Sequence, residues 1–339
     1  MEQVDLSVVI PVYKTPMERL LRALKSTAGL TVPHETVVVF DGEPSVDLIK
    51  MVDGYANGSD STVRHIVITH AGLSGARNAG IRASAGTWIT FLDADDEIIP
   101  SGMHSLVAYG NEHGCQLVQG GYTKQMSNSY ERCMLAHESQ LFRSPGVPGF
   151  LRTIFLVDYG TSTAWSKIFL RSFLIEHGVF FDETLPIEDT PFMFDAVVHM
   201  SCIGFMPVNC YRYYRNDDSL VTSFRKDYAR RITTYLLEFK KRIDVLNDWA
   251  VTAAFEQYIV FYLLLIMLHY VFNPANGWDA HKQHDEFDCL VQSEPYRHAL
   301  VHADCRQFSP SKRFTAFAVR HHMFHLMKLI CAFRNQQLH

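Results

Sequence analysis

The chain has 339 residues, of which 47% are apolar and 20% are charged, and its formal net charge is −5. These proportions are those of an ordinary globular protein, which excludes a disordered or fibrous chain, and the length suffices for a sizeable core. The negative net charge argues against a general nucleic-acid-binding protein.

Cysteine usage and the N-terminus both indicate a cytoplasmic protein. The seven cysteines form no C-x-x-C pair, and an odd number does not suit a closed disulfide framework, so we expect reduced thiols. No basic region precedes the first apolar run, which predicts a first strand and no signal peptide. The longest apolar stretch, Tyr258 to Phe272, is shorter than the roughly 20 residues of a membrane-spanning helix, which predicts a buried helix.

The first third of the chain alternates between β-branched runs and helical patterns. The expected strands are 6–12, 35–40, 63–68, 87–92 and 115–121, and the expected helices are 16–29, 45–56, 73–85 and 101–113. Strands that alternate with helices of this length form a parallel sheet with helices on both faces. The sequence therefore predicts an α/β fold.

The alternation weakens after residue 122. Segments 149–158 and 165–178 have helical spacing, 187–200 begins another helix, and 203–215 resembles a strand. From 225 to the end the pattern is helical.

Carboxylates follow two of the expected strands, at the edge where parallel sheets bind ligands. Asp41 ends "VVVFD", and Asp93, Asp95 and Asp96 lie in "FLDADDE". Such crowded carboxylates repel one another unless a cation lies among them, and Mg²⁺ or Mn²⁺ held by one or two carboxylates keeps positions open for phosphate oxygens. This placement favours a metal-diphosphate site over a plain acidic turn.

The segment "GLSGARNAG", residues 72–80, is rich in small side chains. Small residues let a helix approach a sheet or a ligand closely, and Arg77 offers a planar donor to phosphate or base.

Taken together, "SVVIPVYK", Asp41-Gly42, "GLSGARNAGI" and "FLDADD" resemble glycosyltransferase family 2 over roughly residues 4–125, with weaker matches to about 225. The resemblance implies a GT-A fold, with a Rossmann-like, mostly parallel sheet, and inverting transfer of a sugar from a nucleotide-diphosphate donor such as a UDP-sugar. It also implies Mg²⁺ or Mn²⁺. From this resemblance we expect three parts of the chain: a nucleotide-sugar-binding half of the GT-A domain at 1–122, an acceptor-binding half at 123–224 and a helical region at 225–339.

The resemblance also assigns roles to individual residues. Asp41 would contact the base and Arg77 the nucleotide, while Pro11, Tyr13 and Ala94 would complete the donor site. Asp95 would bind the metal, Asp93 the ribose or the metal, and Asp96 would contact either the metal or the groups that hold it. Two departures from the family pattern are Phe40, where a first aspartate is common, and His70-Ala71 in place of Asn-Gly.

Inverting transfer needs a base that takes the proton of the acceptor hydroxyl. By resemblance this is Asp189 of "IEDTPF", with Glu188 as acceptor binder or orienting partner. Without the resemblance, both residues would be read as acids favoured by a helix N-terminus.

Three residues are expected at the acceptor. Trp165 and Lys167 lie in "TAWSKIF", which resembles a Trp-Asn-Lys segment with Ser166 in place of Asn, although a core Trp and a surface Lys would fit equally. Further on, "YRYYRNDDSLVTS" resembles a Tyr-Arg…Ser segment in which Arg215 or Ser219 would close over the diphosphate.

The expected acceptor is a hydroxyl group of a glycan or of a lipid-linked glycan, as in surface polysaccharide synthesis. Segment 312–334 is basic and apolar, with an expected apolar stripe through Val319, Met323, Leu326, Ile330 and Phe333. Such a segment either docks on the protein or lies on the inner face of the membrane. The 17 histidines are scattered, and "VRHHMFH" is typical of a polar face rather than of a metal site.

Two other functions remain open at this point. One is a phosphotransferase of the haloacid dehalogenase type, with Asp93 as nucleophile, and the other is a non-catalytic module that binds a nucleotide sugar.

Overall fold

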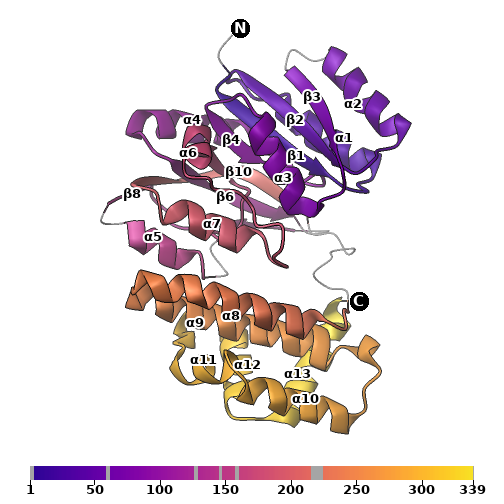
Figure 1. The fold of residues 1–339 in the computed structure, drawn as a ribbon, viewed down its shortest axis with the longest axis vertical. Coiled ribbons are helices and arrows are strands. Elements are labelled where there is room, and N and C mark those ends of the chain that lie inside the picture. The colour runs from indigo at the N-terminus through magenta and orange to yellow at the C-terminus, as the bar shows by residue number, and fades with distance from the viewer. Residues whose placement is uncertain are drawn as a thin grey trace. The chain divides into compact units, whose positions relative to one another are not determined.

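The computed structural model describes residues 4–58, 62–125, 129–144, 147–156, 160–214 and 224–338 (Figure 1). The chain divides into two compact units, Met1–Arg215 and Asn216–His339. The first is an α/β unit and the second is helical. The expected separation of donor and acceptor halves near residue 122 stays a prediction.

The α/β unit alternates strands and helices as far as β6. Its elements are β1 Leu6–Val12, α1 Met17–Thr27, β2 His34–Asp41, α2 Val46–Gly58, β3 Thr62–Ile68, α3 Gly72–Ala83, β4 Trp88–Phe91, β5 Glu97–Ile98, α4 Pro100–His113, β6 Leu117–Gln125, β7 Tyr130–Cys133, β8 Gln140–Arg143, α5 Val147–Thr153, β9 Lys167–Leu170, α6 Arg171–Glu176, α7 Asp189–Val197 and β10 Cys202–Tyr214.

These strands form one mixed sheet in the order β3-β2-β1-β4-β9-β6-β10-β5, in which β7 also pairs with β6 and β8 with β10. The four strands from β3 to β4 are mutually parallel, and β10 is parallel to β6. The strand β9 is antiparallel to both of its neighbours. The expected α/β, mostly parallel architecture is confirmed.

Helices cover both faces of this sheet (Figure 1). On one face, alternate residues of β1 pack against α1, α2 and α4 in a common apolar core. On the other face α3 lies very close to β1, because a Cβ atom added to Gly80 would be 2.2 Å from Val9 Cγ1. The close helix–sheet approach predicted from the small residues is therefore confirmed at Gly80.

The segment 165–178 differs from its prediction as a single helix. Lys167–Leu170 is β9 and only Arg171–Glu176 is helical. The strand fills the position between β4 and β6, where it pairs with both. Because four residues are too few to show a two-residue period, the apolar spacing across both elements imitates one helix.

The second unit consists of helices, as expected. Its elements are α8 Tyr228–Leu246, α9 Trp249–Ile266, η1 Met267–Val271, η2 Pro274–Asn276, α10 Ala280–Gln292, α11 Tyr296–His302, η3 Cys305–Gln307, α12 Pro310–Arg320 and α13 Phe324–Leu338. The helix from Trp249 to Val271 has 23 residues and is longer than the apolar stretch from which it was predicted. By length and composition alone it could cross a membrane. However, 67% of its most apolar window is buried within the protein, as in the core helix of a globular unit.

Segment 312–334 forms two helices rather than one. Arg320 ends α12 and Phe324 begins α13, with His322 between them at a φ of 53°. The expected stripe is wrong in part, because Val319 is buried whereas Met323 and Phe333 are exposed. On α13 the buried face instead contains Met327 and Cys331. Membrane contact through this segment stays a prediction.

Candidate active site

The loops that follow β1, β2 and β4 leave the sheet at the same edge. These strands are parallel neighbours, with Val12 opposite Phe40 and Val9 opposite Phe91. The carboxyl ends of parallel strands therefore bring the loops that contain Tyr13, Asp41 and Asp93 together.

A buried arginine joins two of the predicted site residues. Arg77, on α3, donates from one terminal nitrogen to Asp189 Oδ1 at 2.6 Å and from the other to Asp93 Oδ1 at 2.9 Å. Its side chain is only 2% exposed, and the rings of Phe181 and Phe91 lie 5.2 and 6.0 Å from the guanidinium carbon. Burial opposes the positive charge, but Asp189 and Asp93 outweigh it and hold the pKa of Arg77 above its usual value.

The predicted base and its neighbour begin α7. Glu188 is the N-cap residue and Asp189 the first helical residue. Burial raises the pKa of both carboxyl groups, and Arg77 offsets part of this effect on each. The backbone of Ala164 also forms a hydrogen bond to Asp189. A carboxylate with a raised pKa takes up a proton more readily, which suits general base catalysis.

The three aspartates after β4 are not equivalent. Asp93 and Asp95 are half-buried, and between them Ala94 is buried. Arg22 donates a hydrogen bond to the backbone carbonyl of Asp95. This bond fixes the backbone of the loop.

Asp96 does not join the other two. It is 1% exposed, its Oδ2 accepts from the Tyr211 hydroxyl at 2.8 Å, and its Oδ1 accepts from the backbone N–H of Tyr214 at 2.8 Å. Burial, with a contribution from Asp93, raises the pKa of Asp96 to about 8. Because both oxygens are bound inside the fold, the geometry does not favour Asp96 as a metal ligand. It anchors the loop to β10.

At the expected nucleoside end, Asp41 holds the loop that enters α3. Its carboxylate accepts from the backbone N–H groups of Ala71 and Gly72 at 2.7 and 3.0 Å, and His70 Nδ1 lies 2.7 Å from Oδ2. The His70 ring stacks on Tyr13, with 4.4 Å between ring centroids. Both rings are about half exposed. His70, whose role the sequence did not disclose, therefore links Asp41 to Tyr13. Pro11 is buried within β1.

The residues expected at the acceptor are structural in their contacts. Trp165 is buried and stacks on Tyr211 at 4.7 Å. Lys167 is fully buried rather than at the surface, and its Nζ donates to the carbonyl of Gly160 at 2.9 Å. Burial lowers the pKa of Lys167 to about 7. Arg215 and Ser219 lie outside the described residues.

Sequence reasoning missed two further features. Asn78, on α3, donates to Phe181 O at 2.9 Å and accepts from Phe181 N at 2.8 Å, which fastens the segment leading into α7. Ser166 has a φ of 63°, a left-handed conformation that Asn tolerates better than most residues. This left-handed backbone gives a physical reason why the Trp-Asn-Lys segment that "TAWSKIF" resembles has Asn at the position of Ser166.

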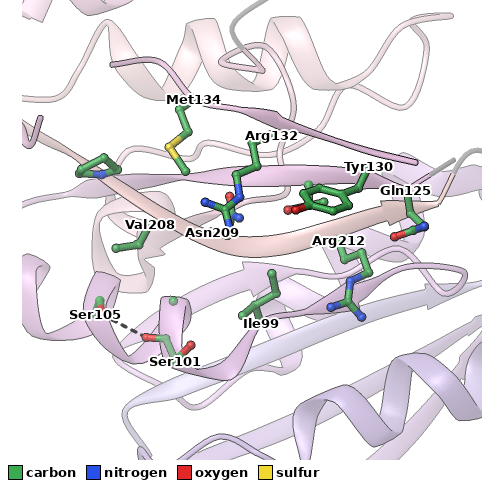
Figure 2. Close-up of a pocket in the computed structure, with 13 residues that line it drawn as sticks. Ile99, Ser101, Ser105, Gln125, Tyr130, Arg132, Met134, Val208, Asn209 and Arg212 are labelled. Carbon is green, nitrogen blue, oxygen red and sulfur yellow. Dashed lines mark hydrogen bonds between the residues drawn. The ribbon is translucent and has the colours of Figure 1, made fainter. Parts of the chain in front are cut away.

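A pocket of about 570 Å³ lies elsewhere in the α/β unit, between α4, β7 and β10 (Figure 2). Arg132 and Tyr130 of β7, Arg212 and Asn209 of β10, and Ser101 of α4 line it. Guanidinium, amide and hydroxyl groups of this kind bind sugar hydroxyls and phosphate oxygens. The predicted acceptor residues that the structure describes do not line this pocket.

Comparison with known proteins agrees with these features. The family model described as "Glycosyl transferase family 2" matches residues 7–174. An uncharacterized glycosyltransferase of Escherichia coli K12, YibD, is 26% identical over 272 residues, which cover 70% of this chain and 76% of the relative. The succinoglycan biosynthesis protein ExoO of Rhizobium meliloti is 28% identical over 234 residues, covering 66% of this chain and 64% of the relative.

Among solved structures, residues 1–349 of S. aureus TarS, in complex with UDP-GlcNAc, match with a TM-score of 0.65. The match covers 98% of this chain and 92% of that one, at 17% sequence identity, and so it establishes a shared GT-A fold. The family match and the glycosyltransferase relatives decide against the phosphotransferase and the non-catalytic module. Residues 7–174 of the chain therefore form a glycosyltransferase family 2 domain.

Proposed function

We propose that this glycosyltransferase moves a sugar, with inversion, from a UDP-type nucleotide donor to a hydroxyl group of a glycan or lipid-linked acceptor. We also propose that it uses Mg²⁺ or Mn²⁺. The observation that carries the proposal is the Asp93–Arg77–Asp189 cluster. It puts the predicted base next to the predicted donor site, although the two lie far apart in the sequence.

The residues near the diphosphate position fit a hard divalent cation. Asp95 and Asp93 would hold the ion through carboxylate oxygens, which are the ligands that Mg²⁺ prefers. Arg77 occupies Asp93 Oδ1, so Oδ2 is the oxygen of Asp93 that we assign to the metal. The ion would act as a Lewis acid that neutralises charge on the leaving diphosphate.

We assign the role of the base to Asp189. The acceptor oxygen attacks the anomeric carbon, the bond from that carbon to the diphosphate breaks, and the proton of the acceptor hydroxyl passes to Asp189. Arg77 holds one carboxylate oxygen in place at 2.6 Å and keeps the ionised form stable before the reaction. Glu188, the adjacent N-cap residue, would orient the acceptor.

The nucleoside end is assigned to Tyr13, His70 and Asp41. The stacked, half-exposed rings of Tyr13 and His70 offer an apolar face to a base. Asp41, which is buried, would position this pair of rings, because its carboxylate accepts from the backbone N–H groups of Ala71 and Gly72 and lies 2.7 Å from His70 Nδ1.

The pathway and the location are also proposals. A relative named for succinoglycan biosynthesis supports surface polysaccharide synthesis, and a related fold solved with UDP-GlcNAc makes that sugar nucleotide the first donor to test. We place the enzyme in the cytoplasm, at the inner face of the membrane. The exposed Phe314 and Phe317 on the basic helix α12 support this placement.

Donor and metal can be tested together by thermal unfolding. A panel of UDP-sugars, beginning with UDP-GlcNAc, is added to the protein with and without Mn²⁺. We expect one donor to raise the melting temperature, and to do so only when the metal is present. Asp95→Ala should abolish this shift, whereas Asp47→Asn, an exposed aspartate in the first turn of α2, should not.

The base is tested by donor hydrolysis and sugar transfer. Asp189→Asn should retain the donor-dependent rise in melting temperature and lose at least about 100-fold in turnover. Turnover within a few-fold of wild type at saturating donor would show that Asp189 is not the base.

A further inference from the structure

A second group of metal-ligating side chains lies in the helical unit. Glu256 is on α9, and His298 and His302 are on α11. Each residue offers one ligand atom, and these three atoms lie within 4.8 Å of one another. The two histidines are four residues apart and therefore project from the same side of their helix.

The closest pair already has the separation that a bound ion requires. His298 Nδ1 lies 3.3 Å from Glu256 Oε1. A tetrahedral Zn²⁺ with bonds of about 2.0–2.1 Å keeps its ligand atoms roughly 3.3–3.4 Å apart. An ion can therefore replace the proton between these two atoms with little movement of either side chain.

The third side chain is held in a suitable tautomer. His302 Nδ1 lies 2.9 Å from the backbone carbonyl oxygen of His298 and must donate to it, since a carbonyl can only accept. In the neutral ring this leaves the Nε2 lone pair for a ligand. Metal-binding histidines commonly have their other ring nitrogen fixed in this way. The two rings are stacked, with 4.1 Å between centroids.

The surroundings suit an ion that enters from solvent. Glu256 is only 13% exposed, whereas both histidines are exposed. A cavity of about 50 Å³, lined by Glu256, His298 and Asp244 among others, adjoins the cluster. It has room for a water molecule, which would complete a four-coordinate site.

We propose that Glu256, His298 and His302 bind one Zn²⁺-type ion that joins α9 to α11. Two imidazoles and one carboxylate suit Zn²⁺, Co²⁺, Ni²⁺ or Cu²⁺, in contrast to the all-oxygen set at the donor site, which suits Mg²⁺. The simpler interpretation is a Glu256–His298 ion pair without metal. His302 is a ligand in the metal site but is not a member of the ion pair. Substitution of His302 therefore distinguishes the two interpretations.

The test is a titration of the full-length protein, treated with a chelator and then kept in excess Mg²⁺ so that oxygen-only sites are filled. Zn²⁺ binding is measured by calorimetry, and Co²⁺ is added separately because its visible absorption reports the geometry of its ligands. We expect one Zn²⁺ bound, a higher melting temperature with Zn²⁺, and a tetrahedral Co²⁺ spectrum.

His302→Ala and Glu256→Gln should each weaken Zn²⁺ binding by more than about tenfold and abolish the rise in melting temperature. His281→Ala is the matched control, because His281 is an exposed histidine paired with Asp285 one turn along α10, and it should bind Zn²⁺ as the wild type does. His302 is exposed, so its variant should fold even if Glu256→Gln does not. Unchanged Zn²⁺ affinity in His302→Ala would overturn the proposal.

Discussion

Two buried basic side chains, Arg77 and Lys167, act on Asp189 in different ways. Arg77 donates a hydrogen bond to its carboxylate, and Lys167 contributes a longer-range charge effect. Lys167 also donates to the carbonyls of Gly160 and Trp165. These bonds fix the loop whose Ala164 backbone binds Asp189. We therefore propose that Lys167 positions Asp189.

Lys167 should make stability depend on pH. Burial lowers its folded-state pKa to about 7 from the ordinary 10.5, so between these values the unfolded chain binds a proton that the folded protein does not. The free energy of unfolding should therefore rise as pH increases from about 7 towards 10.5. Lys167→Met should remove this contribution, so the stability advantage of the wild type should be larger at pH 9 than at pH 6.5.

Thermal unfolding of both proteins at the two pH values measures the effect. Lys50→Met, at an exposed position on α2, is the control and should track the wild type at both. An equal difference between wild type and Lys167→Met at pH 6.5 and pH 9 would contradict the assignment.

At the scale of single residues, the sequence predicted which residues lie in the candidate site, but it did not predict which of them contact one another. Asp93, Arg77 and Asp189 were predicted and do form one cluster. However, Arg77 was expected to reach the nucleotide, and its observed partners are the two carboxylates. Which partner a guanidinium takes depends on what the fold buries beside it, and a sequence motif does not encode that.

At the scale of elements, α3 owes its position to Gly80. A methyl group there would overlap Val9, a β-branched side chain held in the sheet, so α3 would have to move away from β1. We expect Gly80→Ala to lower the free energy of unfolding by about 1–3 kcal/mol. Because α3 carries Arg77, turnover should fall as well.

Gly54 provides the matched control. It also lies within a helix, α2, but nothing lies within 4 Å of the position of an added Cβ atom. Gly54→Ala should leave stability unchanged or raise it by roughly 0.5–1 kcal/mol. Chemical denaturation of both variants makes the comparison, and equal effects at Gly80 and Gly54 would contradict the close-packing argument.

Elements were predictable where a pattern was long enough to show its period. The buried strand 6–12 was predicted with the boundaries observed for β1. In contrast, β9 and α6 were predicted as one helix because a short strand and the following helix share a continuous apolar spacing. The break between α12 and α13 occurs at His321–Met323, where neither Gly nor Pro marks a helix end.

At the scale of the whole molecule, the helical unit presents apolar side chains among basic ones. Phe314 and Phe317 on α12 and Leu329 and Phe333 on α13 are all more than half exposed. Anionic lipid would attract the basic residues and receive the apolar ones. We expect the protein to sediment with phosphatidylglycerol vesicles at low salt, and less with phosphatidylcholine vesicles.

Phe314→Ser and Phe317→Ser, combined, should reduce this sedimentation several-fold. Trp249→Ser is the control, because Trp249 is 83% exposed at the start of α9, outside the basic segment, and it should have no effect. If the wild type does not sediment with anionic vesicles, the proposed peripheral membrane contact is wrong. The acceptor would then have to reach the enzyme in solution.

The bond from Arg77 to Asp189 spans 112 residues of sequence, and this has a consequence for the order of folding. While the chain is being synthesised, α3 emerges long before α7 does. Until α7 has been synthesised, Asp93 is present to balance the charge of Arg77 but Asp189 is not. Burying the Arg77 guanidinium at that stage would be costly, because part of its counter-charge is missing. We therefore expect the N-terminal strands to pair early while the neighbourhood of Arg77 stays hydrated. That neighbourhood becomes dry only when the segment that carries Asp189 packs over it.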